Sequence, residues 1–185
     1  MRKVGLLLGM VLLLGLTAAA QDSSKVDLFA GYSYVRATPA TPGAPGFNLN
    51  GGSASAAYYL TRSFGIVSDF GGYHVSRVGS TPVSGTLYTY LFGPRLAYHG
   101  SSRVTPFAQA LFGGAHGSAS AFGGSASGNA FAMSAGGGLD VNASEHIGFR
   151  LVQAEYLMSR FREGPSSNRS TQNNARISTG IVFRW

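Results

Sequence analysis

The last ten residues of the chain alternate between two kinds of side chain. Successive side chains of a β-strand point to opposite faces, so this pattern predicts a strand with two different faces. The largely apolar face carries Ile177, Thr179, Ile181, Phe183 and Trp185. The opposite face carries Arg176, Ser178, Gly180, Val182 and Arg184. A strand with lipid on one side and a polar lumen on the other has this composition, and Trp185 would then lie at the membrane–water boundary.

Seven further segments carry a similar period-two pattern. Nothing after residue 20 is apolar over the ~18 residues that a transmembrane helix needs. Each predicted strand has about 10–12 residues, which is long enough to cross a membrane at a tilt. The start of the second strand is open, because Asn50-Gly51 could instead form a hairpin turn. The seven strands are Val26–Val35, Asn50–Tyr59, Phe64–Tyr73, Thr86–Tyr98, Thr105–Ala115, Ala130–Val141 and Ile147–Met158.

The predicted connections alternate between long and short. The long ones are Ala37–Phe47, Val75–Gly85, His116–Gly128 and Ser159–Asn174, and the short ones are Leu60–Ser63, His99–Arg103 and Asn142–His146. Bacterial outer-membrane barrels have longer loops outside and short turns in the periplasm. The pattern therefore predicts an all-β fold, an eight-stranded antiparallel up-and-down transmembrane β-barrel. Its last strand should pair with its first, because an open sheet edge is not tolerated in lipid.

Residues 1–20 predict a cleaved signal peptide rather than a membrane span. Arg2 and Lys3 precede an apolar run from Val4 to Leu16, and residues 18–20 are the small alanines that a signal peptidase requires. The apolar run is too short for a transmembrane helix. The expected domain organisation is a signal peptide, 1–20, followed by a single outer-membrane barrel domain, 21–185.

Composition narrows the possible chemistry. The chain has no cysteine, which excludes disulfides, thiol nucleophiles and cysteine zinc sites. Charged residues make up 11%, against about 25% in an ordinary globular protein, and this suits alternating strands better than amphipathic helices. The formal charge of +7 becomes +5 without Arg2 and Lys3. Its basic residues are scattered singly, which favours contact with anionic lipid headgroups over nucleic-acid binding.

Four segments resemble the OmpA-like eight-stranded outer-membrane barrel proteins. They are residues 26–34 (VDLFAGYSY), 91–95 (LFGPR), 105–109 (TPFAQ) and 180–185 (GIVFRW). The similarity covers residues 24–185 and extends to small barrels known only as outer-membrane β-barrel domain proteins. It implies delivery through the periplasm by chaperones and insertion by the barrel-assembly machinery, which reads an aromatic last residue. Trp185 stands where phenylalanine is commoner in that signal, and none of the four motifs is catalytic.

Strand parity places a set of polar side chains inside the tube, namely Asp69, Arg95, Gln109, Asp140, Glu155, Arg176 and Arg184. They could form a gated ion path or a proton relay. We favour a structural interpretation, because a narrow lumen has to pair its charges and an unpaired buried charge costs several kcal/mol. Eight strands enclose little more than their own side chains, and inward glycines should make room for the larger ones.

The seventh strand poses a problem of register. Arg150 and Glu155 are five residues apart and cannot share one face of a regular strand. Either one of the two points outward near an interface or a β-bulge intervenes. Gln153 and Glu155 are expected inside.

Arginines on or beside the long loops are candidate contacts with lipopolysaccharide. Guanidinium groups bind phosphate through paired hydrogen bonds, although solvated loop charges would give the same pattern. The candidates are Arg77, Arg160, Arg162 and Arg169, with Arg36 nearby.

The remaining polar residues do not predict a reaction centre. His74 and His116 fall at one rim and His99 and His146 at the other, so no metal site is expected. A serine follows each histidine of the first pair by two residues, as a lipid-modifying enzyme could require. The sequence as a whole predicts a monomeric, non-enzymatic outer-membrane barrel without a cofactor, with a structural or surface-interaction role. The alternatives are a narrow porin, the lipid-modifying enzyme and a soluble periplasmic ligand-binding barrel.

Overall fold

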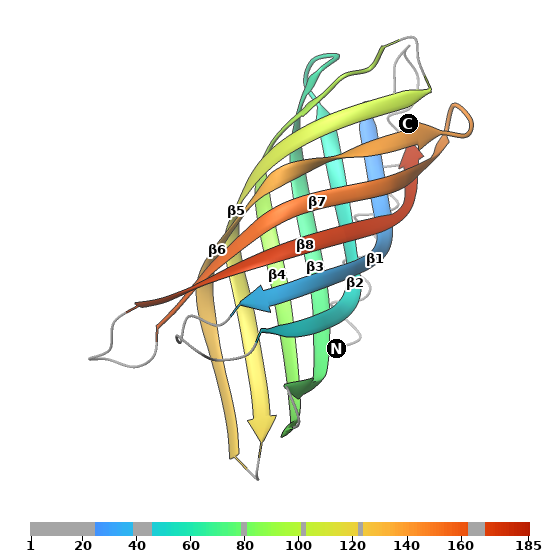
Figure 1. Cartoon of the computed structure of the whole chain (residues 1–185). Coiled ribbons are helices and arrows are strands. Elements are labelled where there is room, and N and C mark those ends of the chain that lie inside the picture. The colour runs from blue at the N-terminus through green and yellow to red at the C-terminus, as the bar shows by residue number, and fades with distance from the viewer. Residues whose placement is uncertain (1–24, 39–45, 79–80, 101–102, 122–123, 163–168) are drawn as a thin grey trace, which may run out of the picture.

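The computed structural model describes residues 25–38, 46–78, 81–100, 103–121, 124–162 and 169–185. In this part of the chain eight strands form one closed sheet in which every strand is antiparallel to its neighbours (Figure 1). The predicted eight-stranded barrel is thus confirmed. The strands are β1 (Val26–Thr38), β2 (Phe47–Tyr59), β3 (Phe64–Val78), β4 (Thr81–Ala97), β5 (Val104–Ala121), β6 (Gly124–Asn142), β7 (Ile147–Arg162) and β8 (Arg169–Arg184). None of the described residues belongs to a helix that is long and apolar enough to span a bilayer.

The first and last strands close the barrel, as the sequence predicts. Their register runs from the pair Asp27–Arg184 to the pair Thr38–Asn173. Pairing all round the sheet satisfies the backbone N–H and C=O groups that lipid cannot hydrogen-bond. Inside the seam the Ser33 hydroxyl lies 2.6 Å from that of Ser53 and 2.7 Å from that of Ser178, which joins β2, β1 and β8.

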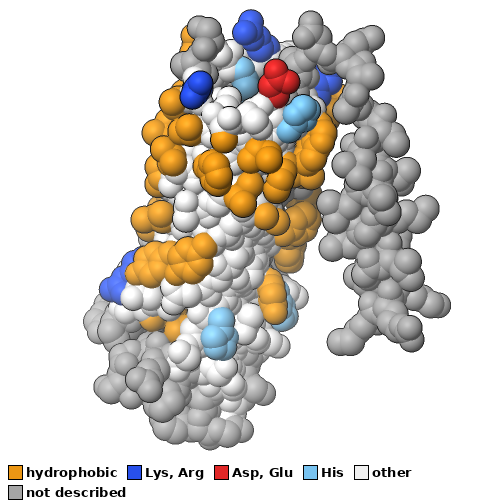
Figure 2. Space-filling model, turned by 90° about the vertical axis from the view of Figure 1, so that its right-hand side faces the viewer, with side chains coloured by type: hydrophobic (Ala, Val, Ile, Leu, Met, Phe, Trp, Pro, Cys, Tyr) orange, Lys and Arg blue, Asp and Glu red, His pale blue; other side chains and the backbone are white. Residues whose placement is uncertain are grey.

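The outer wall is apolar and the inner wall is packed. Large hydrophobic side chains such as Phe70, Phe92 and Phe112 are about half exposed on the outside, and Figure 2 shows such side chains gathered over the outer wall. On β8, Ile177, Thr179, Ile181 and Phe183 point outward while Arg176, Ser178, Val182 and Arg184 are buried. Trp185 follows the strand and stacks on Phe183, with 6.0 Å between ring centroids.

The strands are longer than the sequence pattern predicts. They have 13 residues in β1 and β2 and up to 19 in β6, whereas about 10 are needed to span a membrane. The barrel therefore has a turn end, where both β1 begins and β8 ends, and a hairpin end, where the extra length lies. In Figure 1 the turn end is at the top, and the hairpins project below and to the left.

Three predicted long loops are wrong in extent. Only residues 79–80 separate β3 from β4 and only residues 122–123 separate β5 from β6, so Val75–Gly85 and His116–Gly128 are mostly strand. The predicted loop Ser159–Asn174 shrinks to residues 163–168 between β7 and β8. Near its tip, the hairpin of β5 and β6 has no buried face, because residues 116–120 are exposed or partly exposed on both sides. The apolar alternation therefore stops although the backbone pairing continues. Asn50-Gly51 lies within β2 and is not a turn.

Candidate functional site: the lumen network

A network of charged and amide side chains fills the part of the lumen nearest the turn end. All seven residues that parity places inside are buried, and they are joined by three more inward side chains. We call the following ten residues the lumen network: Asp27, Asp69, Arg95, Gln109, Asp140, Arg150, Gln153, Glu155, Arg176 and Arg184.

Glu155 is the best-connected acceptor of the lumen network. Its Oε1 accepts hydrogen bonds from Gln109 Nε2 at 2.8 Å and from Ser134 Oγ at 2.9 Å. Its Oε2 accepts from Gln153 Nε2 at 2.8 Å and from Arg176 Nε at 2.7 Å. Both carboxylate oxygens thus accept two hydrogen bonds each, from donors on β5, β6, β7 and β8. This arrangement fits the ionised carboxylate, in which both oxygens only accept hydrogen bonds. A proton on either oxygen, or an NH₂ group in its place, would point at a group that already donates.

Arg176 links strands that are not neighbours in the sheet. Its side chain is fully buried, and it forms ion pairs with Glu155 on β7 and with Asp69 on β3. The Nη1 atom lies 2.8 Å from Asp69 Oδ1 and also donates to the Tyr73 hydroxyl at 3.0 Å. Since β3 and β8 are separated by β1 and β2, these bonds cross the lumen.

Arg150 resolves the register problem of the seventh strand. It is 1% exposed and points inward, as do Gln153 and Glu155, while Leu151 and Val152 are 59% and 39% exposed. Two consecutive outward residues mark a β-bulge, and the pairing of β7 with β8 shifts register between Arg150 and Gln153. The bulge, which the sequence left as one of two alternatives, therefore brings three polar side chains of β7 to the same face.

The bulge delivers Arg150 to a second group of charges. Its guanidinium forms a two-bond ion pair with Asp140, at 2.8 and 3.0 Å, and donates to Gln153 Oε1 at 2.6 Å. Arg184 lies 3.3 Å from Asp140 and 3.3 Å from Asp27. A chain of alternating charge therefore leads from β7 through β6 and β8 to β1.

Aromatic rings stack on the cations of the lumen network. The Arg150 guanidinium lies 4.3 Å from the ring centroid of Phe29 and 4.4 Å from that of Phe107. Arg95 lies 4.5 Å from the centroid of Phe107, and it donates two hydrogen bonds to Gln109 Oε1 at 2.9 and 2.6 Å. Phe107 thus contacts both arginines, in the arrangement that gives cation–π attraction its full strength in a water-poor site.

The lumen network is balanced in charge. Its carboxylates are Asp27, Asp69, Asp140 and Glu155, and its guanidinium groups are Arg95, Arg150, Arg176 and Arg184. Four of the chain's seven acidic residues are placed here. A balanced and hydrogen-bonded cluster is the form in which buried charge is tolerated, and it offers no excess charge that would attract ions of one sign.

Beyond the lumen network, toward the hairpin end, the large inward side chains are mainly apolar, although Ser159 and Asn174 are also buried there. The next large inward side chains are Leu91 on β4, Leu111 on β5 and Leu157 on β7, all at most 1% exposed. With Val35 and Leu49 they belong to one hydrophobic cluster. Among the described residues, the buried charges are therefore confined to the part of the lumen nearer the turn end. The interior resembles the packed core of a soluble protein at one end and a salt-bridge network at the other.

Inward glycines make room for these side chains, as expected. A Cβ at Gly138 would lie 2.8 Å from the Phe107 ring. At Gly71 a Cβ would collide with the Tyr73 hydroxyl, the same group that receives a hydrogen bond from Arg176. Glycine lowers the stability of a strand, but at these positions it leaves the space that a large inward ring requires.

Tyrosines mark a boundary on the outer wall near the hairpin end. The Tyr32 hydroxyl donates to Asn50 Oδ1 and the Tyr156 hydroxyl donates to Asn173 Oδ1, both at 2.6 Å. Such rings with one wet edge are typical of the membrane interface. Beyond this boundary Arg36 and Arg160 are exposed, and Arg36 donates to Asn48 Oδ1 at 2.6 Å. The side chains of Arg77, Arg162 and Arg169 lie outside the described part of the chain.

The four histidines lie on different parts of the barrel, with His74 on β3, His116 on β5, His99 after β4 and His146 before β7. In the described ranges no group of three or more histidine, aspartate or glutamate residues is arranged to hold a metal ion. His74 and Ser118 lie in one row of the outer wall, separated by Thr86 on β4, which puts them about 10 Å apart. His116 Nδ1 instead lies 2.8 Å from Asn129 Oδ1. Neither arrangement gives a serine–histidine contact.

The sequence did not place two members of the lumen network inside, namely Asp27 and Arg150, whereas Gln153 was expected there. Asp27 has inward parity and could have been included on that ground alone. Arg150 could not, because its orientation depends on the bulge at Leu151 and Val152. A sequence criterion based on charged residues also leaves out inward tyrosines. One of them, Tyr59, donates a hydrogen bond to Asp27 Oδ2 at 3.2 Å.

Comparison with known proteins identifies the fold and the family. A family model described as outer membrane protein beta-barrel domain matches residues 6–184. Ail, the attachment invasion locus protein of Yersinia pestis, is 20% identical, with a TM-score of 0.62 over 89% of this chain and 100% of Ail. Neisserial surface protein A is 15% identical, with a TM-score of 0.67 over the same shares. The N-terminal barrel domain of OprF from Pseudomonas aeruginosa is 15% identical, with a TM-score of 0.54 over 89% of this chain and 100% of that domain. No curated protein sequence matches the chain.

Proposed function

The chain belongs to the outer membrane protein beta-barrel domain family, and we propose that it is a non-conducting barrel with a structural or surface-interaction role. The outer membrane is the location that family and fold give it. The observation that supports a non-conducting role is the packed lumen, in which charge-balanced ion pairs adjoin a plug of leucines. A narrow porin needs a continuous water path, and an enzyme of the outer leaflet needs a catalytic group on the outer wall.

Conductance across a planar bilayer tests this role directly. We expect the purified barrel to give no steady channel, since Leu91, Leu111 and Leu157 are buried inside the barrel and would oppose the passage of a hydrated ion. The sample must first show a shift in electrophoretic migration between unheated and boiled detergent solutions, which reports a closed barrel. Reproducible unitary currents from a heat-modifiable sample would establish the porin instead.

The proposal includes an orientation. The turn end would face the periplasm and the hairpin end the outside, as in bacterial outer-membrane barrels. Export would require removal of residues 1–20 as a signal peptide, and those residues lie outside the described part. Because the chain has no cysteine, a Ser118→Cys variant provides one thiol near the hairpin end. A membrane-impermeant maleimide should label it in intact cells.

Surface interaction would rest on the cations at the hairpin end. We propose that Arg160, with Arg77, Arg162 and Arg169, contacts phosphates of lipopolysaccharide. Ail has been solved in complex with the heparin analogue sucrose octasulfate, so a barrel of this fold is able to receive a polyanion. Replacing Arg160, Arg162 and Arg169 with serine should weaken binding in a titration with purified lipopolysaccharide. An unchanged titration would argue for solvated loop charges.

Biogenesis would depend on the end of β8. We propose that periplasmic chaperones deliver the chain and that the barrel-assembly machinery recognises its aromatic C-terminal residues. The stacked rings of Phe183 and Trp185 support this role, since they lie on the outer wall where an insertase could read them. A Trp185→Gly variant should insert poorly in cells but fold normally in detergent. Equal insertion of variant and parent would remove Trp185 from the signal. The protein is expected to act as a monomer without nucleic acid.

A further inference from the structure

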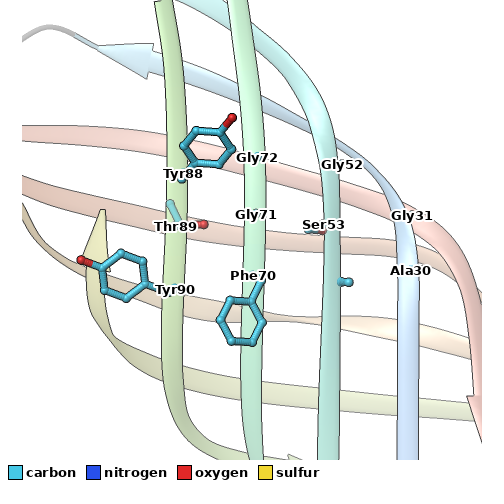
Figure 3. A pocket seen from close by; sticks show the side chains of 11 residues that line it. Ala30, Gly31, Gly52, Ser53, Phe70, Gly71, Gly72, Tyr88, Thr89 and Tyr90 are labelled. Carbon is cyan, nitrogen blue, oxygen red and sulfur yellow. The ribbon is translucent and has the colours of Figure 1, made fainter. Parts of the chain in front are cut away.

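A groove runs across the outer wall of β1 to β4 (Figure 3). Its volume is about 690 Å³. Phe70, Tyr88 and Tyr90 form one side, and the other outward residues that line the groove are small, namely Ala30, Gly52, Ala54 and Gly72. In Figure 3 the three rings lie over β3 and β4, and the lining residues labelled on β2 and β1 are Gly52, Ser53, Ala30 and Gly31.

The floor of the groove is empty although a side chain would fit there. A Cβ added at Gly52 would meet only the Gly31 carbonyl, at 3.4 Å, and one added at Gly72 would meet only the Tyr88 ring, also at 3.4 Å. Inward glycines such as Gly71 differ, because a Cβ there would collide with the Tyr73 side chain. Internal packing therefore does not require glycine at 52 or 72. Glycine within a strand costs stability and commonly marks a place where a ligand approaches the backbone.

The groove lies just inside the membrane boundary. Gly52 pairs with Tyr32, whose hydroxyl binds Asn50, the next outward residue of β2 toward the hairpin end. Asn50 pairs with His74 of β3, which is also exposed. One step further along the wall, Arg36 extends its guanidinium beside Asn48. The surface thus changes from a bare apolar floor to hydrogen-bond donors and then to a cation.

We propose that this groove holds one acyl chain of a lipopolysaccharide molecule whose phosphate is bound by Arg36. The inference rests on the proposed orientation, which places the hairpin end in the outer leaflet. Arg36 and Ala30 are six residues apart on β1, or about 20 Å, a separation that a phosphate and one extended chain can bridge. Guanidinium and phosphate form strong paired hydrogen bonds. A second copy of the barrel fits the groove less well. Its convex wall would rest on the rings of Phe70 and Tyr88 and leave the floor empty, so the van der Waals contacts of the floor would not form.

The test compares retention of lipopolysaccharide by variants of the mature barrel. Gly52→Leu fills the floor, and its matched control is Ala154→Leu on the outer wall of β7, away from the groove. Arg36→Ser removes the cation, and its control is Arg62→Ser at the turn end, which is also exposed. Each protein is reconstituted in nanodiscs with purified lipopolysaccharide, with deacylated lipopolysaccharide or with phosphatidylglycerol alone, and bound molecules are counted by native mass spectrometry. All variants must first show heat-modifiable migration.

The expected result separates the variants from their controls. Affinity for lipopolysaccharide should fall at least about fivefold in Gly52→Leu and about tenfold in Arg36→Ser. Both controls should bind as the parent does, and the deacylated form should bind weakly to all. Equal binding by Gly52→Leu and Ala154→Leu would overturn the groove as a site. Phosphatidylglycerol bound as tightly as lipopolysaccharide would overturn the identity of the lipid.

Failure of this inference can be told apart from failure of the proposed function. If the thiol of Ser118→Cys is labelled from outside while Gly52→Leu behaves as its control, the orientation stands and the groove is not a lipid site. If the thiol is not labelled from outside, the orientation itself is wrong, and the inference fails with it.

Discussion

Replacing Glu155 with glutamine should destabilise the barrel strongly. The parent carboxylate accepts four hydrogen bonds, two on each oxygen. An amide has one oxygen, so either Gln109 and Ser134 or Gln153 and Arg176 would face its NH₂ group. The substitution also leaves the lumen network with one unbalanced positive charge. Removing one partner of a buried ion pair costs about 3–5 kcal/mol.

The magnitude can be measured as a shift in urea unfolding of the barrel in detergent or lipid. With a urea dependence of about 2 kcal/mol per molar, the midpoint should fall by roughly 1.5–2.5 M. Arg176→Gln should cost more, because it leaves both Glu155 and Asp69 without their cation. Glu145→Gln is the matched control, since that carboxylate is exposed in the turn between β6 and β7.

The reasoning would be refuted by a small effect. If Glu155→Gln changes the free energy of unfolding by less than about 0.5 kcal/mol, as a surface substitution does, the lumen network is not under electrostatic constraint. Water entering the lumen would be the physical explanation, and the non-conducting role would lose its main support. An effect of Glu145→Gln as large as that of Glu155→Gln would show that the assay reports net charge rather than burial.

Other substitutions probe separate parts of the fold, each by the same urea titration. Phe107→Leu removes a ring that contacts two guanidinium groups and should cost about 2–4 kcal/mol; a loss below 1 kcal/mol would deny the stacking a stabilising role. Phe112→Arg on the lipid-facing wall should cost about 2–4 kcal/mol, whereas Ser118→Arg on the same face of β5 beyond the boundary should cost about 0–1 kcal/mol; equal costs would misplace the membrane. Gly71→Ala should cost about 1–3 kcal/mol, because its methyl group would collide with Tyr73; a neutral result would show that the ring moves freely.

Most of the fold could be predicted from the alternation of side chains between the two faces of each strand. Each strand has one face in lipid and one in the lumen, so the alternation at Ile177 to Phe183 or Tyr88 to Phe92 reports both the strand and its orientation. Closure of the sheet then follows from the need to pair the last strand with the first. The same rule placed Asp69, Gln109 and Arg176 inside without knowledge of their partners.

Parity fails where the environment of the strand changes. Residues 116–121 extend β5 beyond the boundary, where both faces meet water and glycine, serine and alanine serve equally well on either side. A composition-based criterion takes such a segment for a loop. At Leu151 and Val152 the failure is of another kind, since one extra residue shifts the phase of the pattern. The bulge becomes visible only when the neighbouring strands fix the register.

The pairing within the lumen was beyond prediction because it depends on closure. Asp69 and Arg176 are 107 residues apart and lie on strands separated by two others. Their ion pair cannot form in an open sheet, where the two side chains would be solvated separately. The energy of the lumen network is therefore available only to the closed barrel, and it should make closure cooperative. A barrel in which Glu155 and Arg176 are both replaced by leucine would still satisfy parity, but it would leave Asp69 as an unpaired buried charge. A substitution that removes one charge of the lumen network must therefore be accompanied by removal of its partner's charge. The equal numbers of carboxylates and guanidinium groups, four of each, follow from this requirement.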